Sequence, residues 1–323
     1  MPEATMETTW HGLPAWIVES DTLRCVMVPG RGGKIASLVD RRTGFEWLIG
    51  PGDRPVEPLS YGAWWHEQEM SGWDEMFPTI VTCAYPGPGP HQGESLPDHG
   101  EAWVLPWAVT EAGNGRLSLC LHGQALPYEL TRTADCPEPG TLRLHYRLTN
   151  LGDDAMPYVW AAHPQFLCGE AAEVIFPAGV SEVVNTIPAS WGWGEPETRY
   201  RWPAGTTIDG RAARLDRTAG PDLKRGRKFF ALPGVVTGWA ALRRSDGHWL
   251  RFDWDPKLVP YLGLWVDEGS LNHATVATPE PTTGWYDSLE LAWSKGCVET
   301  VAAHGEREWE LVVTLGDGDL PRS

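Results

Sequence analysis

Apolar and polar side chains alternate through Thr141-Leu142-Arg143-Leu144-His145-Tyr146-Arg147-Leu148-Thr149-Asn150. Successive side chains of a β-strand point to opposite faces, so this period of two predicts a strand with one buried face. The 36 Gly and 28 Pro are spread along the whole chain, where they mark turns between short elements. We find no convincing helical period in any stretch longer than about 12 residues. The sequence therefore predicts many short strands.

Further strands are predicted on both sides of this stretch, at intervals of about 8–15 residues. A hairpin is expected within residues 14–28, followed by a strand at 34–40 and another from 45 onwards. Residues 50–77 and 186–222 are rich in Pro, Gly and Trp and are expected to be loops, and residues 289–293 a turn or a short helix. The remaining predicted strands are 102–109, 117–122, 128–133, 158–166, 229–242, 249–254, 261–266 and 308–315.

The number of strands, about fifteen or more, indicates a large β-sandwich with few short helices. The chain has 323 residues, of which 42% are hydrophobic, so it can bury a sizeable core. It contains no low-complexity linker, no repeat of fixed period and no clear domain boundary. We therefore expect residues 1–323 to form one domain of an all-β fold.

The formal net charge of −17 disfavours nucleic acid and anionic membranes as partners. No apolar run approaches the roughly 18 residues of a membrane span, and the first residues lack the basic and apolar regions of a secretory signal. The six cysteines form no Cys-x-x-Cys pair and have no zinc-ligand spacing with His, which is typical of free thiols in a reducing compartment. These features predict a soluble cytoplasmic protein.

Common cofactor motifs are absent from the sequence. Gly30-Arg31-Gly32-Gly33 is too short for a dinucleotide fingerprint, and neither a phosphate loop nor a Gly-x-Ser-x-Gly elbow occurs. His66-Glu67-Gln68-Glu69-Met70 lacks the second His of a His-Glu-x-x-His zinc motif, which favours a solvated loop over a metal site. We therefore expect neither a cofactor nor a metal.

Three segments place ionisable side chains in unusual settings. His99 lies in Pro97-Asp98-His99-Gly100-Glu101-Ala102-Trp103, at the expected start of a strand, and His163 lies in the apolar run Val159-Trp160-Ala161-Ala162-His163-Pro164-Gln165-Phe166. Glu280 lies between two prolines in Ala277-Thr278-Pro279-Glu280-Pro281-Thr282-Thr283-Gly284, at the expected end of a strand. The prolines fix φ and would hold the carboxylate in an extended segment. Each segment alone is more often structural, and only their combination points to a site.

In order and spacing these segments resemble the aldose 1-epimerases and their galactose mutarotase-like relatives, along nearly the whole chain. The resemblance extends to Gly32-Gly33-Lys34-Ile35-Ala36-Ser37-Leu38-Val39-Asp40, to Gly72-Trp73-Asp74-Glu75-Met76-Phe77-Pro78 and to His304-Gly305-Glu306. It implies a β-supersandwich whose site lies in the concave sheet. It also implies that His163 is the general acid, Glu280 the general base, and His99 a hydrogen-bond donor that orients the substrate.

Mutarotation opens a cyclic hemiacetal, in which the anomeric hydroxyl loses a proton while the ring oxygen gains one. A His that titrates near neutrality and a carboxylate in a partly apolar site suit these two tasks, without a metal or a nucleotide. Trp side chains can stack on the apolar face of a sugar, and the 19 Trp are several times the usual share. The candidates for contact with the substrate are Trp64, Trp73, Trp191, Trp193, Trp265, Asp74 and Arg31.

Some positions depart from the family pattern. His163-Pro164-Gln165-Phe166 replaces the His-Ser-Tyr-Phe of galactose mutarotases, and Asp98-His99-Gly100-Glu101 replaces their Leu-His-Gly-Gly. Asp216 is near the expected distance from Glu280 for the substrate-binding Asp, in a different context. The branch that acts on hexose 6-phosphates has an Arg where this chain has Met70. The prediction is therefore an epimerase that interconverts the α and β anomers of a free, unphosphorylated aldose, with galactose not favoured.

Two other functions remain open. The Trp-rich loops at 60–77 and 186–202 suit a non-catalytic carbohydrate-binding or sensing protein on the same scaffold, since a fold does not fix a function. The adjacent Asp74 and Glu75 could serve a lyase or a hydrolase, and a glycosidase needs its two carboxyl groups about 5–9.5 Å apart in one pocket. The expected ligand is a small carbohydrate, and the sequence does not indicate the oligomeric state.

Overall fold

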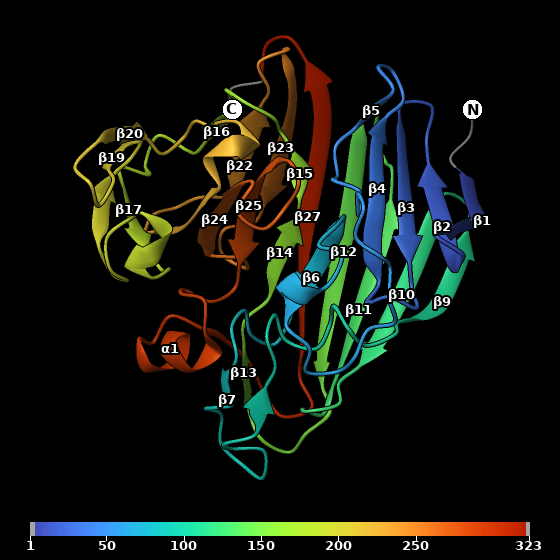
Figure 1. Ribbon diagram of the computed structural model, residues 1–323. Helices are drawn as coiled ribbons and strands as arrows, with labels where there is room; N and C mark the ends of the chain where they lie inside the picture. Colours follow the sequence, from blue (N-terminus) through green and yellow to red (C-terminus); the bar gives the residue numbers. More distant parts are fainter. Residues whose placement is uncertain (1–3, 321–323) are drawn as a thin grey trace.

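Two large antiparallel sheets form the body of the protein, for which a computed structural model describes residues 4–320 (Figure 1). The first sheet has 13 strands, in the order β1-β2-β3-β4-β6-β14-β25-β24-β21-β17-β18, with β5 paired to β4 and β15 paired to β25. Its strands are β1 (Ala4–Trp10), β2 (Leu13–Glu19), β3 (Leu23–Val28), β4 (Lys34–Asp40), β5 (Phe45–Glu46), β6 (Trp73–Met76), β14 (Ala161–Pro164), β15 (Phe166–Leu167), β17 (Glu182–Asn185), β18 (Arg199–Arg201), β21 (Arg225–Ala231), β24 (Tyr261–Glu268) and β25 (Thr275–Thr282).

The second sheet has 8 strands, in the order β16-β22-β23-β27-β12-β11-β10-β9. Its strands are β9 (Ala108–Gly113), β10 (Arg116–His122), β11 (Tyr128–Asp135), β12 (Thr141–Asn150), β16 (Glu173–Ile175), β22 (Trp239–Arg243), β23 (His248–Trp254) and β27 (Glu306–Asp317). Strands β1 to β3 of the first sheet pack against β9 to β12 of the second. The fold is therefore the large all-β sandwich that the sequence predicts.

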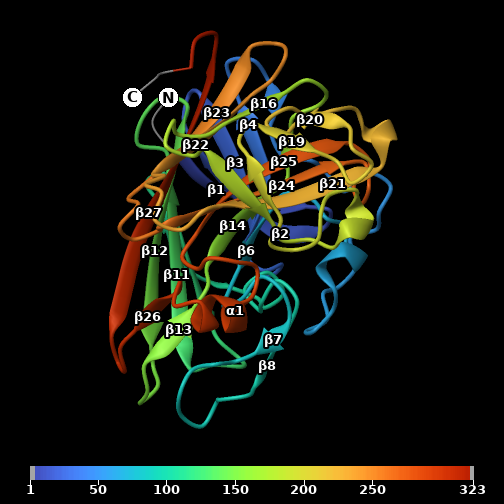
Figure 2. The ribbon, with the colours of Figure 1, turned by 90° about the vertical axis from the view of Figure 1, so that its left-hand side faces the viewer.

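Shorter elements lie at the ends of the sandwich. The pairs β7 (Cys83–Ala84) with β8 (Ser95–Leu96) and β13 (Met156–Tyr158) with β26 (Glu299–Val301) lie at the bottom of Figures 1 and 2, near the helix α1 (Leu289–Ser294). Strands β19 (Ala204–Thr206) and β20 (Ala212–Arg214) form a further pair. Three 3₁₀ turns complete the described elements: η1 (Trp65–Glu67), η2 (Ala189–Trp191) and η3 (Pro221–Leu223).

Strand β12 shows why the alternating pattern forms a sheet. Leu142, Leu144, Tyr146 and Leu148 are fully buried and face the core between the sheets. The polar residues between them face outward, and β12 pairs with β11 on one side and with β27 on the other. Burying one face while pairing both edges satisfies the backbone and removes apolar surface from water.

Strand β6 lies inside the segment predicted to be a loop, so the expectation for residues 50–77 is wrong at Trp73–Met76. It joins β4 to β14 in the middle of the first sheet. One of the two charged residues of β6, Glu75, is buried in the core. The Glu75 carboxylate oxygens accept hydrogen bonds from Arg132, Tyr146 and Trp160. A charge is tolerated in a core only when it is paired and hydrogen-bonded in this way, and sequence alone does not reveal such partners.

Three other predicted strands also differ from the structure. Residues 102–107 form turns and irregular backbone, and β9 begins only at Ala108. The indole N–H groups of Trp103 and Trp107 donate to the backbone carbonyls of Asp98 and Ala102 in this region. The run 158–166 is divided among β13, β14 and β15, and the run 229–242 between β21 and β22. In the second and third cases a long apolar run contains short strands separated by irregular segments.

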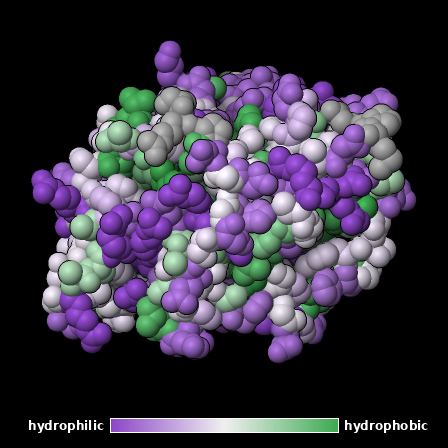
Figure 3. All heavy atoms as spheres, turned by 90° about the horizontal axis from the view of Figure 1, so that it is seen from above, coloured by the Kyte–Doolittle hydropathy of each residue, from purple (hydrophilic) through white to green (hydrophobic). Residues whose placement is uncertain are grey.

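The surface is mainly hydrophilic in the view of Figure 3, in line with the acidic composition. All six cysteines are free thiols, and five of them are buried, as the lack of paired spacing predicts. No helix within residues 4–320 has the length and apolar character needed to cross a membrane.

Candidate functional site

A cavity of about 230 Å³ opens on the face of the first sheet that points away from the core. Alternation places the site residues on this face: in β6, Asp74 points towards the cavity region while its neighbours Trp73 and Glu75 point into the core. The cavity has apolar walls and a polar floor. It is lined by Trp64, Trp65, His66, Ile80, Val81, Asp98, His99, His163, Ile187, Lys228, Trp265, Leu271 and Asp287.

The structure brings together the two residues that were expected to act as acid and base. Nε2 of His163 on β14 lies 3.9 Å from Oε1 of Glu280 on β25. Both side chains are almost completely buried. The sequence predicted Glu280 at the end of a strand, but it lies within β25. Its flanking prolines pair in register with Leu264 and Leu262 of β24. On the other edge of β25 they lie in the gap between the pairings with β14 and with β15, where no ladder needs an N–H.

Glu280 is held at the floor of the site by a buried lysine. Lys228 on β21 donates a hydrogen bond to Oε2 of Glu280, and its Nζ lies 3.7 Å from Oδ1 of Asp287. Burial raises the pKa of Glu280 to about 7, against the opposing effect of the Lys228 ammonium. Burial alone would lower the pKa of Lys228, but the two carboxylates outweigh it and raise that pKa, so the lysine stays charged.

One oxygen of Glu280 remains available to a ligand. Oε1 has no hydrogen-bond partner among residues 4–320, and the same holds for Oδ1 of Asp287. Gly263, directly across from Glu280 on β24, makes room for this side chain, because a Cβ there would lie 2.9 Å from Oε2. A buried carboxylate oxygen without a partner is costly unless a bound molecule supplies a donor, so Oε1 is free to accept a hydrogen bond from such a molecule.

His163 is neutral in its resting state. Asn272 donates to Oε1 of Gln165, which leaves the Gln165 amide nitrogen facing Nε2 of His163 at 3.1 Å. This arrangement assigns the ring proton to Nδ1, for which residues 4–320 offer no hydrogen-bond partner. Burial, with His99 and Lys228 adding positive charge, lowers the pKa of His163 well below its usual value. Gln165 therefore donates a hydrogen bond to His163 from the position at which galactose mutarotases have a tyrosine.

Trp65 positions both histidines. Its indole ring stacks on His99, with ring centroids 5.0 Å apart and an interplanar angle of 15°, and its centroid lies 4.6 Å from that of His163. Asp98 accepts a hydrogen bond from the backbone N–H of Trp65 and lies 3.0 Å from Nδ1 of His99. Gly100 permits the turn that carries His99, because a Cβ at its φ of 69° would overlap the Phe77 carbonyl. The sequence had not singled out Trp65 or the role of Asp98.

Arg31 and Asp74 are buried next to the cavity without lining it, so the expectation that they contact the substrate is wrong. Asp74 accepts hydrogen bonds from the indole of Trp65 and from Lys34, at 2.9 and 2.8 Å. Arg31 pairs with Glu69, which also lies 3.4 Å from Lys34. Neither Arg31 nor Asp74 lines the cavity. This buried network fixes Trp65, and through it the two histidines.

Of the five candidate tryptophans, two line the cavity, two are buried in the core, and Trp191 contacts Trp265 without lining the cavity. Trp64 and Trp265 line the cavity, Trp64 at its exposed rim and Trp265 with an edge contact to Trp191. Trp73 and Trp193 are fully buried in the core, where Trp73 packs against Phe166 and Phe252, so the expectation that they meet a substrate is wrong.

Other candidates from the sequence do not reach the cavity or do not converge. Asp216 pairs with Arg214 outside the site. His66 lines the cavity and Glu67 is exposed, whereas Glu69 is buried against Arg31. The residues His66, Glu67 and Glu69 therefore do not form the metal cluster that their spacing could suggest.

Lys228 and Asp287 are site residues that the sequence analysis missed. Lys228 stands in the strand sequence Arg-Gly-Arg-Lys-Phe-Phe-Ala of β21, where a charge next to two aromatic residues was a usable signal. In register it lies opposite Trp265, on the cavity face. Asp287 follows β25 and precedes α1, and nothing in its sequence context marks it.

Solved structures of similar shape identify the architecture. A galactose mutarotase-like protein from Clostridium acetobutylicum superposes with a TM-score of 0.68 at 12% identity, covering 98% of this chain and 99% of the other. A galactose mutarotase-like protein from Lactobacillus casei gives 0.66 at 18% identity, with coverage of 94% and 100%. This chain has a galactose mutarotase-like fold.

The galactose mutarotase-like fold extends over nearly the whole described chain. A galactose mutarotase related enzyme from Lactobacillus acidophilus also matches, with a TM-score of 0.66 at 14% identity over 96% of this chain and all of that one (100%). No protein-family model matches the chain, and no protein of curated function is detectably similar in sequence. At such identities the likeness concerns the architecture, and the activity has to be argued from the site.

Proposed function

We propose that this protein is an aldose 1-epimerase that interconverts the anomers of a free, unphosphorylated sugar. The observation that carries the proposal is the approach of His163 Nε2 to Glu280 Oε1, 3.9 Å apart, where His163 lines a cavity with Trp walls and Glu280 lies directly behind His163 and Lys228. The anomeric oxygen and the ring oxygen are both bonded to C1 of the sugar. An acid and a base that serve these two oxygens must therefore lie close together.

In the singly protonated pair the proton rests mainly on Glu280, and the proposed reaction proceeds from the minor form in which His163 carries this proton and Oε1 of Glu280 accepts the proton of the anomeric hydroxyl. The bond between C1 and the ring oxygen breaks, and the ring oxygen takes a proton from the protonated His163 imidazole. The open aldehyde rotates about the C1–C2 bond, and the same two groups return the protons when the ring closes on the other face of C1. The pair must hold one proton in total at the start and at the end.

The charges around the cavity favour a neutral sugar. Lys34, Arg31 and Lys228 are each paired with buried carboxylates of the protein. A phosphate group would have to compete with these pairs and lose its hydration at the same time. Apolar walls from Trp265, Ile187 and Leu271 suit the C–H face of an uncharged ring.

A glycosidase based on Asp74 and Glu75 is not supported. Glu75 points into the core and is bonded to Arg132, whereas Asp74 lies on the opposite face of β6. Two carboxyl groups on opposite faces of a strand cannot act on one glycosidic bond. A non-catalytic carbohydrate-binding protein is the second candidate, favoured by the exposed Trp64 at the cavity rim, 51% of which is accessible.

Polarimetry on freshly dissolved α-anomers of glucose, galactose, xylose and arabinose tests the proposal. Acceleration of the approach to anomeric equilibrium for at least one sugar is expected. Calorimetric binding of a sugar without such acceleration would favour the carbohydrate-binding alternative and overturn the epimerase.

The pH dependence of the reaction follows from the shared proton. With the pKa of Glu280 at about 7 and that of His163 below its usual value, the singly protonated pair predominates between these two values. We expect kcat/KM to be bell-shaped and to fall as the pH rises through about 7, after subtraction of the spontaneous rate. A rate that climbs steadily through this range would show that the pair does not hold the reacting proton.

Removal of the Trp265 ring is expected to weaken substrate binding. The Trp265→Ala variant should raise KM by about tenfold, since loss of an aromatic contact costs about 1–1.5 kcal/mol, with little change in kcat. Trp293→Ala is the matched control, because Trp293 is exposed on α1 and does not line the cavity. Saturation polarimetry gives both constants, and equal KM values for the two variants would place the sugar elsewhere.

A further inference from the structure

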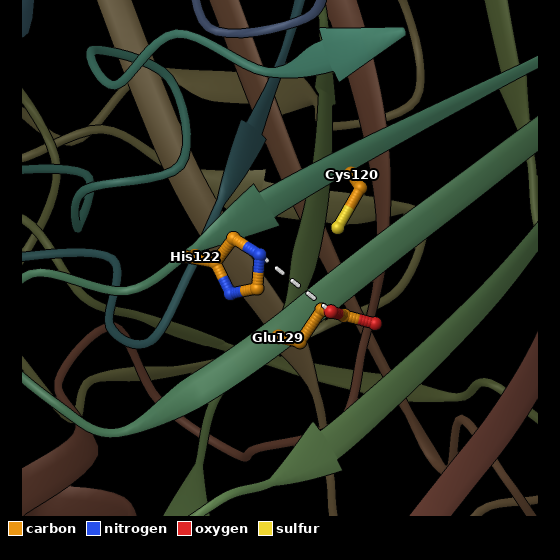
Figure 4. Close-up of side chains that lie close together, drawn as sticks. All are labelled: Cys120, His122 and Glu129. Carbon is orange, nitrogen blue, oxygen red and sulfur yellow. Dashed lines mark ion pairs between the residues drawn. The ribbon is translucent and has the colours of Figure 1, made fainter. Parts of the chain in front are cut away.

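A second cluster of reactive side chains lies on the outer face of the second sheet, away from the cavity. Cys120 and His122 are two residues apart on β10 and therefore share a face. Glu129 on β11 is the direct cross-strand partner of His122, and Thr131 is the partner of Cys120. Figure 4 shows the imidazole and the carboxylate facing each other across the two strands, with the thiol beside them.

The donor atoms of this cluster are close enough to share one ion. One ligand atom from each of Cys120, His122 and Glu129 lies within 4.8 Å of the others. His122 Nε2 is 3.6 Å from Glu129 Oε2. Cys120 is only 8% exposed, so its position is fixed, whereas the side chains of His122 and Glu129 are 68% and 32% exposed and can adjust.

We propose that Cys120, His122 and Glu129 form a binding site for a zinc ion, with water as the fourth ligand. Zinc takes sulfur at about 2.3 Å and nitrogen or oxygen at about 2.0–2.2 Å in a tetrahedron, which puts ligand atoms about 3.5 Å apart. The His122–Glu129 separation already has this value. Small rotations of the two exposed side chains bring their donor atoms to the sulfur without moving either strand.

The ligand types select the metal. A thiolate and an imidazole prefer zinc over magnesium or calcium, which take oxygen ligands. Binding releases the thiol proton to solvent, and the Glu129 carboxylate and the thiolate together balance the two charges of the ion. The Thr131 hydroxyl lies against the sulfur and can donate to it, whereas Arg147, across from Thr131 on β12, opposes the cation. Sequence spacing did not predict this site because its ligands come from two strands.

Titration of the full-length protein with zinc tests the proposal. The protein is first stripped with a chelator and kept reduced with a phosphine. Isothermal calorimetry should give one equivalent bound. Cys120→Ser and His122→Gln should each weaken binding by at least about tenfold. Because His122 is exposed, its variant keeps the proposal testable if the cysteine variant folds poorly.

Matched controls separate this site from other surface groups. Cys297→Ser removes the one partly exposed thiol outside the cluster among residues 4–320, and His145→Gln removes an exposed histidine on the neighbouring β12. Both should bind zinc like the wild type. Cobalt(II) should give a thiolate charge-transfer band that is lost in Cys120→Ser. Zinc binding that is equal in wild type and Cys120→Ser, or no cobalt–thiolate band, would overturn the proposal.

The result does not depend on the epimerase proposal. The cluster lies on the second sheet, and the cavity lies on the far face of the first. Zinc should raise the Tm of the wild type, since a ligand that binds only the folded state stabilises it, and at the same zinc concentration should raise the Tm of His122→Gln by less. An unchanged Tm in both proteins at saturating zinc would contradict a site that joins β10 to β11.

Discussion

The Glu280→Gln variant is expected to lose mutarotation activity by about 10²–10⁴-fold, the typical contribution of a general base. Glutamine keeps the shape of the side chain but cannot accept the anomeric proton. Because the interaction is made in the transition state, kcat and kcat/KM should fall together while KM changes little. Polarimetry with excess enzyme measures the residual rate above the spontaneous reaction.

Two controls make this result interpretable. Glu290→Gln changes an exposed glutamate on α1 and should retain full activity. Thermal unfolding of Glu280→Gln shows whether the fold is kept, since Lys228 loses one of its two carboxylate partners. A folded Glu280→Gln variant with the wild-type rate would remove Glu280 from the reaction and with it the proposed mechanism.

Replacement of Lys228 by methionine is expected to affect both stability and pH dependence. Without the ammonium, the buried Glu280 carboxylate loses its charged partner and holds its proton more tightly. The alkaline limb of the rate profile should then move up by about one pH unit or more, and the maximal rate should fall by about tenfold. Breaking a buried pair costs about 3–5 kcal/mol when one charge is left behind. Protonation of Glu280 offsets part of this loss, so about 3 kcal/mol is expected in the free energy of unfolding.

The sign of the stability change with pH follows from the same group. Burial raises the pKa of Glu280 in the folded protein to about 7, above its unfolded value. Its contribution to stability is therefore fully present below the unfolded pKa and is lost as the pH rises through the folded pKa. In Lys228→Met the folded pKa is higher still, so this loss should begin at the same pH as in the wild type but continue to a higher pH and become larger. Urea unfolding on both sides of neutrality measures it.

Three further variants decide whether Lys228 acts through Glu280. Lys228→Arg keeps the charge and should leave the alkaline limb near its wild-type position. Lys224→Met removes an exposed lysine from the turn before β21 and should change nothing. The double variant Lys228→Met/Glu280→Gln should recover part of the lost stability, because of the two carboxylates that faced Lys228 only Asp287 remains without its charged partner. An unshifted pH profile in Lys228→Met would show that the ammonium does not set the ionisation of Glu280.

The sequence predicted the sandwich because its strongest signals are local. The alternation of apolar and polar residues in β12 repeats in the sequences of β10 and β23, and the turns between strands are marked by Gly and Pro. Such patterns reflect a core on one side and solvent on the other. Strand β6 was not predicted because both of its faces carry charges, Asp74 and Glu75, and each is neutralised by a partner far away in the chain. Burial of this kind is visible only in three dimensions.

The site was predictable to the extent that the family's motifs are short and linear. His99, His163 and Glu280 each lie in a recognisable segment, and the structure brings them together, with His99 and His163 lining the cavity and Glu280 next to His163. Lys228 and Asp287 come from elements without such motifs and could not be chosen among the many charged residues. The sequence pointed to the wrong tryptophan. Trp73, in the motif shared with the family, was expected to contact the substrate but packs in the core. Trp65, in a loop without a motif, was not singled out but contacts both histidines.

The double-sided strand β6 limits how the pocket can be altered. Its two adjacent carboxylates belong to separate networks, one inside the sandwich with Arg132 and one beneath the cavity with Lys34. Both networks are attached to the same four residues of β6. A substitution that alters the Glu75–Arg132 pair would therefore be expected to shift Asp74 on the cavity side as well. An engineer who wants a different sugar should leave this strand untouched and vary the rim, where Trp64 and Ile187 stand on loops that no core pairing constrains.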